Sequence, residues 1–137
     1  MSTTSTNALH SASATTKGGS FLTDVEAAGH AFISDASKPH GGGTAASPMD
    51  LLTAALAACT TMTVQSYAAR KEWPLETVSA SVEHLAKSGD EPERFEMQLD
   101  IQGQLDADQR ASLESIAHKC PVHKVIAGSV PVRVHLQ

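Results

Sequence analysis

Apolar side chains occupy every face of one predicted helix in the middle of the chain. Residues 51–59 read Leu-Leu-Thr-Ala-Ala-Leu-Ala-Ala-Cys, without a charged residue. A helix that is apolar all round has to be covered by other parts of a protein. A bilayer would also cover it, but a membrane span needs about 20 apolar residues, and polar side chains interrupt this run soon after Cys59. The pattern therefore predicts a central, nearly enclosed helix that carries Cys59 near its middle.

The residues around this helix indicate where it begins and ends. The hydroxyl of Ser47 can accept hydrogen bonds from free amides, Pro48 fits the first turn, and Asp50 can complete a capping box. The segment 38–43 ahead of the cap is rich in glycine, which predicts a flexible loop. At the other end, the residue before Pro74 avoids helical geometry, so the helix is expected to end ahead of it.

The other elements are predicted from shorter patterns on either side of the long helix. Six segments have the alternation or the turn residues at their ends that are typical of strands. These predicted strands cover residues 8–16, 20–27, 30–35, 77–86, 95–101 and 130–136. Before the last of them, we expect a helix that opens at Asp106 and reaches Cys120. A short helix then runs from Pro121 to a terminating Gly128.

The order of these elements indicates the fold class. Three strands, the buried helix, two strands, two helices and a final strand predict an α+β chain with one sheet of about six strands. A sheet shields a helix on one side only, so the buried helix needs further cover. We therefore expect a homodimer in which the partner's helices or sheet complete the burial. The alternative is that the two C-terminal helices complete it within one chain.

Composition narrows the class of protein. The chain has 137 residues and a net charge of −5. This length suits one domain, expected over residues 8–137 behind a flexible tail of residues 1–7. The sequence has no basic patch or stripe, so we expect no nucleic-acid partner. It begins with neither an apolar signal segment nor an arginine-rich one, so we expect a cytoplasmic protein without a membrane partner.

Cys59 is one of two cysteines in the chain, and in a reducing compartment such residues are often catalytic, redox-active or metal-binding. A free cysteine thiol has a pKa near ~8.5, and apolar surroundings raise that pKa further. Cys59 also lies about three turns from the helix start, too far for the positive helix terminus to act on it. As a nucleophile it needs a cation or a hydrogen-bond donor from elsewhere in the fold or from a partner subunit. The alternative is a small core residue among alanines.

The surroundings of Cys120 favour a thiolate more directly. It precedes Pro121, which can start a helix, so the sulfur is expected near free amides. Positive charge is available nearby from His118, Lys119, His123 and Lys124. The two histidines and Cys120 could also bind a metal ion, with Cys59 as a further ligand. Their spacing matches no standard zinc signature, so we expect no metal.

The capped helix that holds Cys59 and the later Cys-Pro-Val segment at Cys120 resemble the OsmC/Ohr family of thiol-dependent peroxidases. The resemblance covers residues 9–136 and implies an intertwined homodimer of β3-α-β2-α2-β subunits, with active sites at the dimer interface. It implies that Cys59 is the peroxidatic cysteine, which forms a sulfenic acid with an organic or lipid hydroperoxide. Cys120 would be the resolving cysteine that closes a disulfide. It also implies an external dithiol reductant, such as a lipoyl group, and no bound cofactor.

Two positions depart from the organic-hydroperoxide branch of that family. The branch has a glutamate directly after the helix-starting proline, where this chain has Met49, and Asp50 lies about 100° further round the helix. An N-terminal arginine is also missing, and Lys17 is the only cation in the N-terminal strands. The chain therefore resembles the OsmC-like branch. The candidate substrate-binding or supporting residues are Met49, Asp50, Lys17 and His123, with a solvated Lys17 and a purely capping Asp50 as the alternatives.

Two functions from different classes stay open at this point. The first is a cysteine peroxidase that reduces organic or lipid hydroperoxides in oxidative or osmotic stress defence. The second is a dimeric module, non-catalytic or redox-sensing, that binds a small hydrophobic ligand beside Cys59. The missing arginine and glutamate favour the second function, whereas the presence of both cysteines favours the first.

Overall fold

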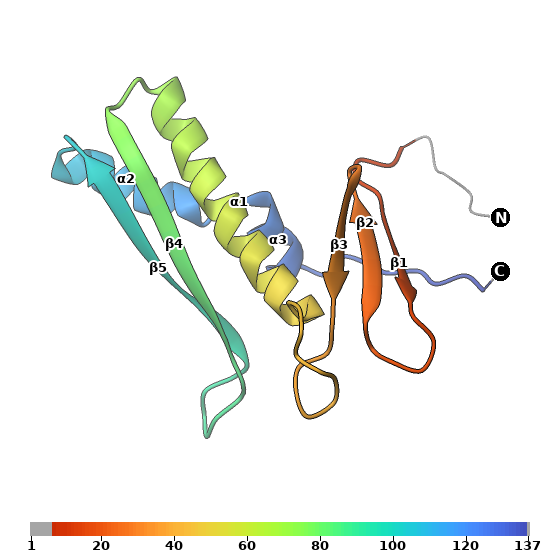
Figure 1. Ribbon diagram of the computed structural model, residues 1–137. Coiled ribbons are helices and arrows are strands. Elements are labelled where there is room, and N and C mark those ends of the chain that lie inside the picture. The colour runs from red at the N-terminus through yellow and green to blue at the C-terminus, as the bar shows by residue number, and fades with distance from the viewer. Residues whose placement is uncertain (1–6, 137) are drawn as a thin grey trace. The chain divides into compact units, whose positions relative to one another are not determined.

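A computed structural model describes residues 7–136 of the chain and confirms the α+β class (Figure 1). Its elements are β1 (Ala12–Thr16), β2 (Thr23–Ala27), β3 (His30–Ser34), α1 (Pro48–Arg70), β4 (Leu75–Leu85), β5 (Arg94–Gly103), α2 (Ala107–Ala117) and α3 (Pro121–Ala127). These residues form two compact units. The first comprises the chain up to Leu51 together with residues from Arg133 onwards, and the second comprises Leu52–Val132. The predicted tail lies outside the described residues except for Asn7, and the boundaries of the single domain stay a prediction.

The first unit contains the predicted three-stranded antiparallel sheet, in the order β1-β2-β3. The central strand joins its two neighbours through pairs such as Val25 with Ala14 and Val25 with Phe32. Every residue of β1 is exposed, and Phe32 and Ile33 of β3 keep 39% and 45% of their surface accessible. The sheet therefore presents apolar side chains that the described chain leaves uncovered.

The loop between β3 and α1 is organised by one buried carboxylate. Asp35 Oδ1 accepts a hydrogen bond from the backbone N–H of Ala36 at 2.8 Å. Its Oδ2 accepts from the N–H and the hydroxyl of Thr44 at 3.2 and 2.9 Å. The bonds from Thr44 are the main reason that the pKa of Asp35 lies below its ordinary value. A β-carbon at Gly41 would clash with the carbonyl oxygen of Ala36. The glycines predicted to give flexibility thus allow the chain to close tightly around Asp35.

Both ends of α1 agree with the sequence. Ser47 Oγ accepts a hydrogen bond from the N–H of Asp50 at 3.1 Å, and Asp50 Oδ2 accepts from the N–H of Ser47 at 2.9 Å. This reciprocal pair is the predicted capping box, with Pro48 as the first helical residue. The helix ends at Arg70, and the chain turns back towards β4 just after it.

Within the single chain α1 is covered on one side only, so the alternative in which the two C-terminal helices complete its burial is wrong. Leu56, Thr60, Val64 and Ala68 are buried, and their spacing of four residues places them in one stripe along the helix. The other side is open, and Met62 keeps 69% of its surface accessible. The physical reason is that the sheet and helix of the second unit cover only the side they contact. The homodimer that would cover the rest stays a prediction.

The second unit packs α1 and α2 against one face of a β4-β5 hairpin. The two strands are antiparallel, and pairs such as Val78 with Ile101 place apolar side chains opposite each other. Val64, Ala68 and Leu113 form the fully buried centre of this core. The helix α2 begins with a capping box between Asp106 and Gln109 and ends at Ala117, earlier than predicted.

Two further expectations are wrong. The strands form separate sheets of three and two strands in place of one larger sheet. Within the described chain, residues 130–136 form no strand, and the side chains of Val132 and Val134 are almost fully exposed. A strand needs a partner with which to exchange backbone hydrogen bonds, and no neighbouring strand in this structure pairs with that segment. None of the described helices combines the length and the apolar character needed to cross a bilayer.

Candidate functional site

Cys120 caps the last helix of the second unit. It is completely buried, its backbone is extended, and its Sγ accepts a hydrogen bond from the backbone N–H of His123 at 3.4 Å. Pro121 occupies the first helical position, as the sequence indicates. The expectation that a Cys-Pro pair places the sulfur against free helix amides therefore agrees with this geometry.

Cys59 lies about three turns after the start of α1 and is partly exposed. Burial is the main factor that raises the pKa of its thiol, and the Cys120 side chain raises it further as a hydrogen-bonding partner and as a neighbouring charge. The two sulfurs, far apart in the sequence, therefore belong to one site. Both are free thiols in this structure.

Two hydrogen-bond donors near Cys59 lower the pKa of its thiol. The backbone N–H of Val122, in the first turn of α3, and the hydroxyl of Thr63 each lower the pKa of the Cys59 thiol. The Thr63 hydroxyl also donates to the Cys59 carbonyl oxygen at 2.8 Å, because the two residues lie one turn apart. The first turn of α3 thus supplies one amide for each sulfur, from Val122 and from His123. These donors offset part of the effect of burial on Cys59.

Sequence reasoning missed Thr63 and Val122 as neighbours of the thiol. Thr63 has a local signal, since a residue four positions after Cys59 lies on the same side of a helix. Val122 has none, because its amide reaches Cys59 only through the packing of α3 against α1. Imidazole groups also gather near the pair, with the rings of His118 and His123 centred 5.9 Å apart.

The three candidate supporting residues of the N-terminal half lie in the first unit, whereas both cysteines lie in the second. Asp50 acts as the cap acid, and hydrogen bonds from Ser47 lower its pKa. Met49 lies in the first turn of α1 with 41% of its surface exposed. The Nζ of Lys17 lies 3.4 Å from Oδ1 of Asp24 in the neighbouring strand, and both side chains are about half exposed. A role for Met49, Asp50 or Lys17 at the thiol stays a prediction.

The metal hypothesis has no support in the geometry. Across residues 7–136, no three side chains of histidine, cysteine, aspartate or glutamate converge closely enough to hold a metal ion. His118, Cys120 and His123 are neighbours in sequence, yet the Cys120 sulfur accepts from the amide of His123 and the two imidazole rings meet edge to face.

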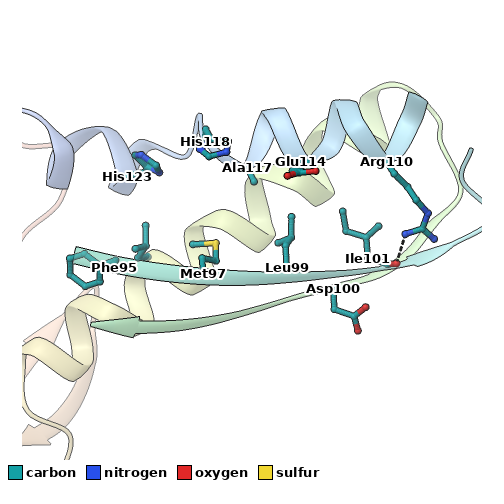
Figure 2. Close-up of a pocket in the computed structure, with 11 residues that line it drawn as sticks. Phe95, Met97, Leu99, Asp100, Ile101, Arg110, Glu114, Ala117, His118 and His123 are labelled. Atoms are coloured by element: carbon teal, nitrogen blue, oxygen red, sulfur yellow. Dashed lines mark hydrogen bonds between the residues drawn. The ribbon is translucent and has the colours of Figure 1, made fainter. Parts of the chain in front are cut away.

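A groove of about 670 Å³ lies beside the thiol pair, within the second unit (Figure 2). Alternate residues of β5 form its floor, and α2 and the start of α3 line the opposite wall. The groove is lined by Leu56, Phe95, Met97, Leu99, Asp100, Ile101, Arg110, Glu114, Ala117, His118 and His123. It borders the cysteines without including them, since Leu56 precedes Cys59 by one turn and His123 binds the Cys120 sulfur through its amide. The sequence predicted the apolar face of β5, but it did not predict the groove between that face and α2.

A family model described as OsmC-like protein matches residues 41–135, which is more than half of the chain. No curated protein matches it. Many solved structures do match. An osmotic stress induced and detoxification response protein from Psychrobacter arcticus is 25% identical, with a TM-score of 0.68 over 83% of this chain and 85% of that one.

Two further solved structures carry names related to peroxide resistance. The organic hydroperoxide resistance protein OsmC from Legionella pneumophila is 26% identical, with a TM-score of 0.63 over 90% of this chain and 93% of that one. The organic hydroperoxide resistance protein OhrB of Bacillus subtilis is 22% identical, with a TM-score of 0.59 over 93% and 97% of the two chains. The fold of the chain is similar to all three.

Proposed function

This chain belongs to the OsmC-like family, and on that basis we propose that it is a cysteine peroxidase that reduces organic or lipid hydroperoxides in stress defence. The observation that carries the proposal is the pairing of Cys59 and Cys120 in one site, with two backbone amides directed at the sulfurs. Two adjacent free thiols, one reachable and one buried, are the groups that a thiol peroxidase needs. The names of the similar structures support the same substrate class.

The first step is an attack by the Cys59 thiolate on the distal oxygen of the hydroperoxide. The O–O bond breaks, sulfur loses two electrons, and Cys59 becomes a sulfenic acid. The leaving alkoxide takes up the proton that the thiol released and departs as an alcohol. Cys59 is the attacking residue in this proposal because it is partly exposed, whereas Cys120 is completely buried. The amide of Val122 and the hydroxyl of Thr63 favour the thiolate that starts the reaction.

The second step uses Cys120 as the resolving thiol. Its sulfur attacks the Cys59 sulfur, the S–O bond breaks, water leaves and a disulfide forms. An external dithiol, such as a lipoyl group, then reduces the disulfide and is itself oxidised to a disulfide. The protein needs no bound cofactor for this cycle, and free thiols of this kind suit a reducing compartment such as the cytoplasm. His123 supports the cycle by holding the Cys120 sulfur through its amide.

A homodimer is part of the proposal. The side of α1 that carries Met62 stays open in the single chain, and apolar residues of β3 and of the C-terminal segment are also exposed. A soluble protein rarely leaves that much apolar surface uncovered. A second copy of the chain would cover these surfaces and could bring further groups to the thiol pair.

The test is stopped-flow consumption of cumene hydroperoxide in the presence of an excess of a small dithiol. We expect Cys59→Ser to abolish turnover, because the attacking sulfur is lost. Cys120→Ser should still consume about one equivalent of peroxide rapidly and then recycle slowly. Ser66→Ala, on the exposed side of the same helix, is the control and should behave like the parent. A Cys59→Ser protein as fast as the parent would refute the peroxidase.

The raised pKa of Cys59 favours a second candidate function. A thiol that is mainly protonated at neutral pH reacts slowly, as suits a dimeric module that binds a small hydrophobic ligand beside an inactive thiol pair. In that case the parent would consume peroxide no faster than free cysteine under the same conditions. The same stopped-flow experiment therefore separates the two functions.

A further inference from the structure

We propose that the imidazole of His123 carries protons to and from the buried Cys120 thiol, with His118 as the link to solvent. This inference rests on the proposed peroxidase cycle and deepens it, because it names the group that handles the proton of the resolving thiol. It concerns the side chain of His123, whereas the contact described above uses the backbone amide of that residue.

The complete burial of Cys120 creates the need for such a group. The residue has no surface exposed to water, so its thiol proton has no direct way out, and a charged sulfur there lacks hydration. The proposed cycle nevertheless requires Cys120 to lose a proton when it attacks Cys59 and to regain one when the disulfide is reduced. The amide of His123 donates to the sulfur but cannot accept a proton from it. A titratable side chain beside the sulfur has to do so.

His123 and His118 form a route from the buried sulfur towards water. The backbone nitrogen of His123 lies 3.4 Å from Cys120 Sγ, so the His123 side chain begins next to the sulfur. Its ring is centred 5.9 Å from that of His118, and both rings line the groove (Figure 2). One water molecule can join two polar groups at such a separation. Exposure increases along the route, since Cys120 is buried, His123 is partly buried and His118 is exposed.

Imidazole chemistry suits both proton transfers, because an imidazole in water has a pKa near ~6.5 and can accept or donate at neutral pH. In the resolving step, Cys120 gives its proton to His123 and its sulfur attacks the Cys59 sulfur. The S–O bond of the sulfenic acid breaks, and the leaving hydroxide takes a proton from the imidazolium and departs as water. In the reductive step, the external dithiol attacks the Cys59 sulfur and the S–S bond breaks. The Cys120 sulfur keeps the electron pair and takes a proton from His123, which His118 replaces from solvent.

Three charged groups line the groove together with the two rings. Glu114 precedes His118 by one turn of α2, so its carboxylate can pair with a protonated His118. Asp100 of β5 points its side chain away from the apolar floor (Figure 2). Arg110 donates to the carbonyl oxygen of Ile101 at 2.9 Å, towards the end of β5. Charges of both signs therefore surround the rings, and the nearest to them in sequence is a carboxylate that favours proton transfer through His118.

The lysines next to this segment do not replace His123. Lys119 and Lys124 are exposed and do not line the groove. A lysine ammonium stays protonated at neutral pH, so it does not accept a proton from a thiol. The Cys59 thiol of α1 also faces Cys120, but it is the reaction partner in both steps.

The first experiment follows disulfide formation in a single turnover. Reduced protein is mixed with one equivalent of cumene hydroperoxide at pH 7 without a reductant, and mass spectrometry separates the sulfenic acid from the disulfide. His123→Ala should convert the sulfenic acid into the disulfide about 100-fold more slowly than the parent, as expected for a lost acid–base group. His123→Gln keeps a polar side chain that does not titrate and should be slow as well.

Two comparison variants share the chemistry of the substitution. His118→Gln should slow disulfide formation less than His123→Ala does, because solvent can partly replace the outer imidazole. His30→Gln, which removes an exposed imidazole of β3, should match the parent. Thermal unfolding of each variant checks that it folds. All His123 variants keep the backbone amide that binds the Cys120 sulfur, so they test the side chain alone.

Two readouts separate proton transfer from a purely structural role. Imidazole in the buffer should restore the rate of His123→Ala in proportion to its concentration, because a free base takes the place of the missing one. From about pH 5 to 8 the parent rate should rise and level off, whereas that of His123→Ala should continue to rise with the thiolate fraction. A His123→Ala protein as fast as the parent would overturn the proposal. So would a slow variant that imidazole does not rescue and that has the pH profile of the parent.

A second experiment without peroxide makes the result independent of the peroxidase. Diamide oxidises the thiol pair to the disulfide, and an excess of dithiothreitol then reduces it at pH 7. His123→Ala should again be the slower protein, because Cys120 leaves without a proton donor. If the parent consumes no peroxide but this difference appears, the peroxidase is lost and the role of His123 stands. If both proteins are reduced at the same rate, the role of His123 is lost, whatever the peroxide result.

Discussion

The hydroxyl of Thr63 offers a direct test of how the protein tunes its reactive thiol. This hydroxyl lies one turn after Cys59, donates to the Cys59 carbonyl oxygen and lowers the pKa of the Cys59 thiol. Thr63→Val removes the hydroxyl and keeps a β-branched side chain of nearly the same shape. The backbone of α1 should therefore stay unchanged. Loss of a donor disfavours the thiolate, so the pKa of Cys59 should rise.

The size of the effect follows from the hydrogen bond that is removed. A hydrogen bond contributes about 0.5–1.5 kcal/mol net, and more when one partner is charged. Thr63 shares its single hydrogen between the carbonyl oxygen and the sulfur, and it is a smaller influence on Cys59 than burial or Cys120. We therefore take about 1 kcal/mol, which corresponds to about fivefold less thiolate at neutral pH.

Alkylation by iodoacetamide measures this fraction, because only the thiolate reacts. The rate at Cys59, followed by mass spectrometry, should fall about fivefold at pH 7. It should converge with that of the parent at a pH well above the pKa of the thiol. Thr61→Val is the matched control, because the Thr61 hydroxyl donates to the Ala58 carbonyl oxygen, away from the sulfur. Equal rates for the two variants at pH 7, or a faster Thr63→Val protein, would contradict the reasoning.

Three further predictions concern stability and assembly. Leu113→Ala should lower the free energy of unfolding by about 2–5 kcal/mol in urea titrations, because Leu113 is fully buried between the sheet and α1; a loss below about 1 kcal/mol would mean that the core is not packed as described. Asp35 should stabilise the fold above its ordinary pKa of 3.8, and this stability should be lost as the pH falls through its lowered folded-state pKa. Asp35→Asn should remove that part of the acid transition, and an unchanged acid-unfolding curve would contradict it. Met62→Glu should shift the protein from dimer to monomer in analytical ultracentrifugation, whereas a parent that sediments as a monomer would rule out the homodimer.

Local signals in the sequence were sufficient for the elements that the structure does form. The cap of α1 needs only Ser47, Pro48 and Asp50, and all three act within one turn. The strands β4 and β5 follow from alternation, since the apolar residues of each strand come at every second position and pair with one another on one face of the hairpin. The same holds for Cys120, because a cysteine before a helix-starting proline falls at the cap position.

The errors concern features that depend on distant parts of the chain. Whether the strands join one sheet or two depends on which strands pair with each other. The alternation of apolar and polar residues does not specify that pairing. Val130–Leu136 has the pattern of a strand, but a strand needs a neighbour, and this structure pairs nothing with it. The long helix reads as apolar all round, yet only the side facing the hairpin is covered. Within the site, the amide of Val122 was unpredictable because α3 approaches Cys59 only through tertiary packing.

The threonines in the middle of α1 change what a partner molecule would meet there. Thr60, Thr61 and Thr63 each turn their hydroxyl back onto a carbonyl oxygen of the preceding turn. Because its hydroxyl donates to the helix backbone in this way, a threonine presents its methyl group outward, much as a valine would. The surface of α1 at these threonines is consequently more apolar than a residue-by-residue hydropathy scale suggests. A protein surface or ligand that settles against Thr61 therefore meets a hydroxyl whose hydrogen is already donated within the helix, so this contact needs no water to satisfy the donor.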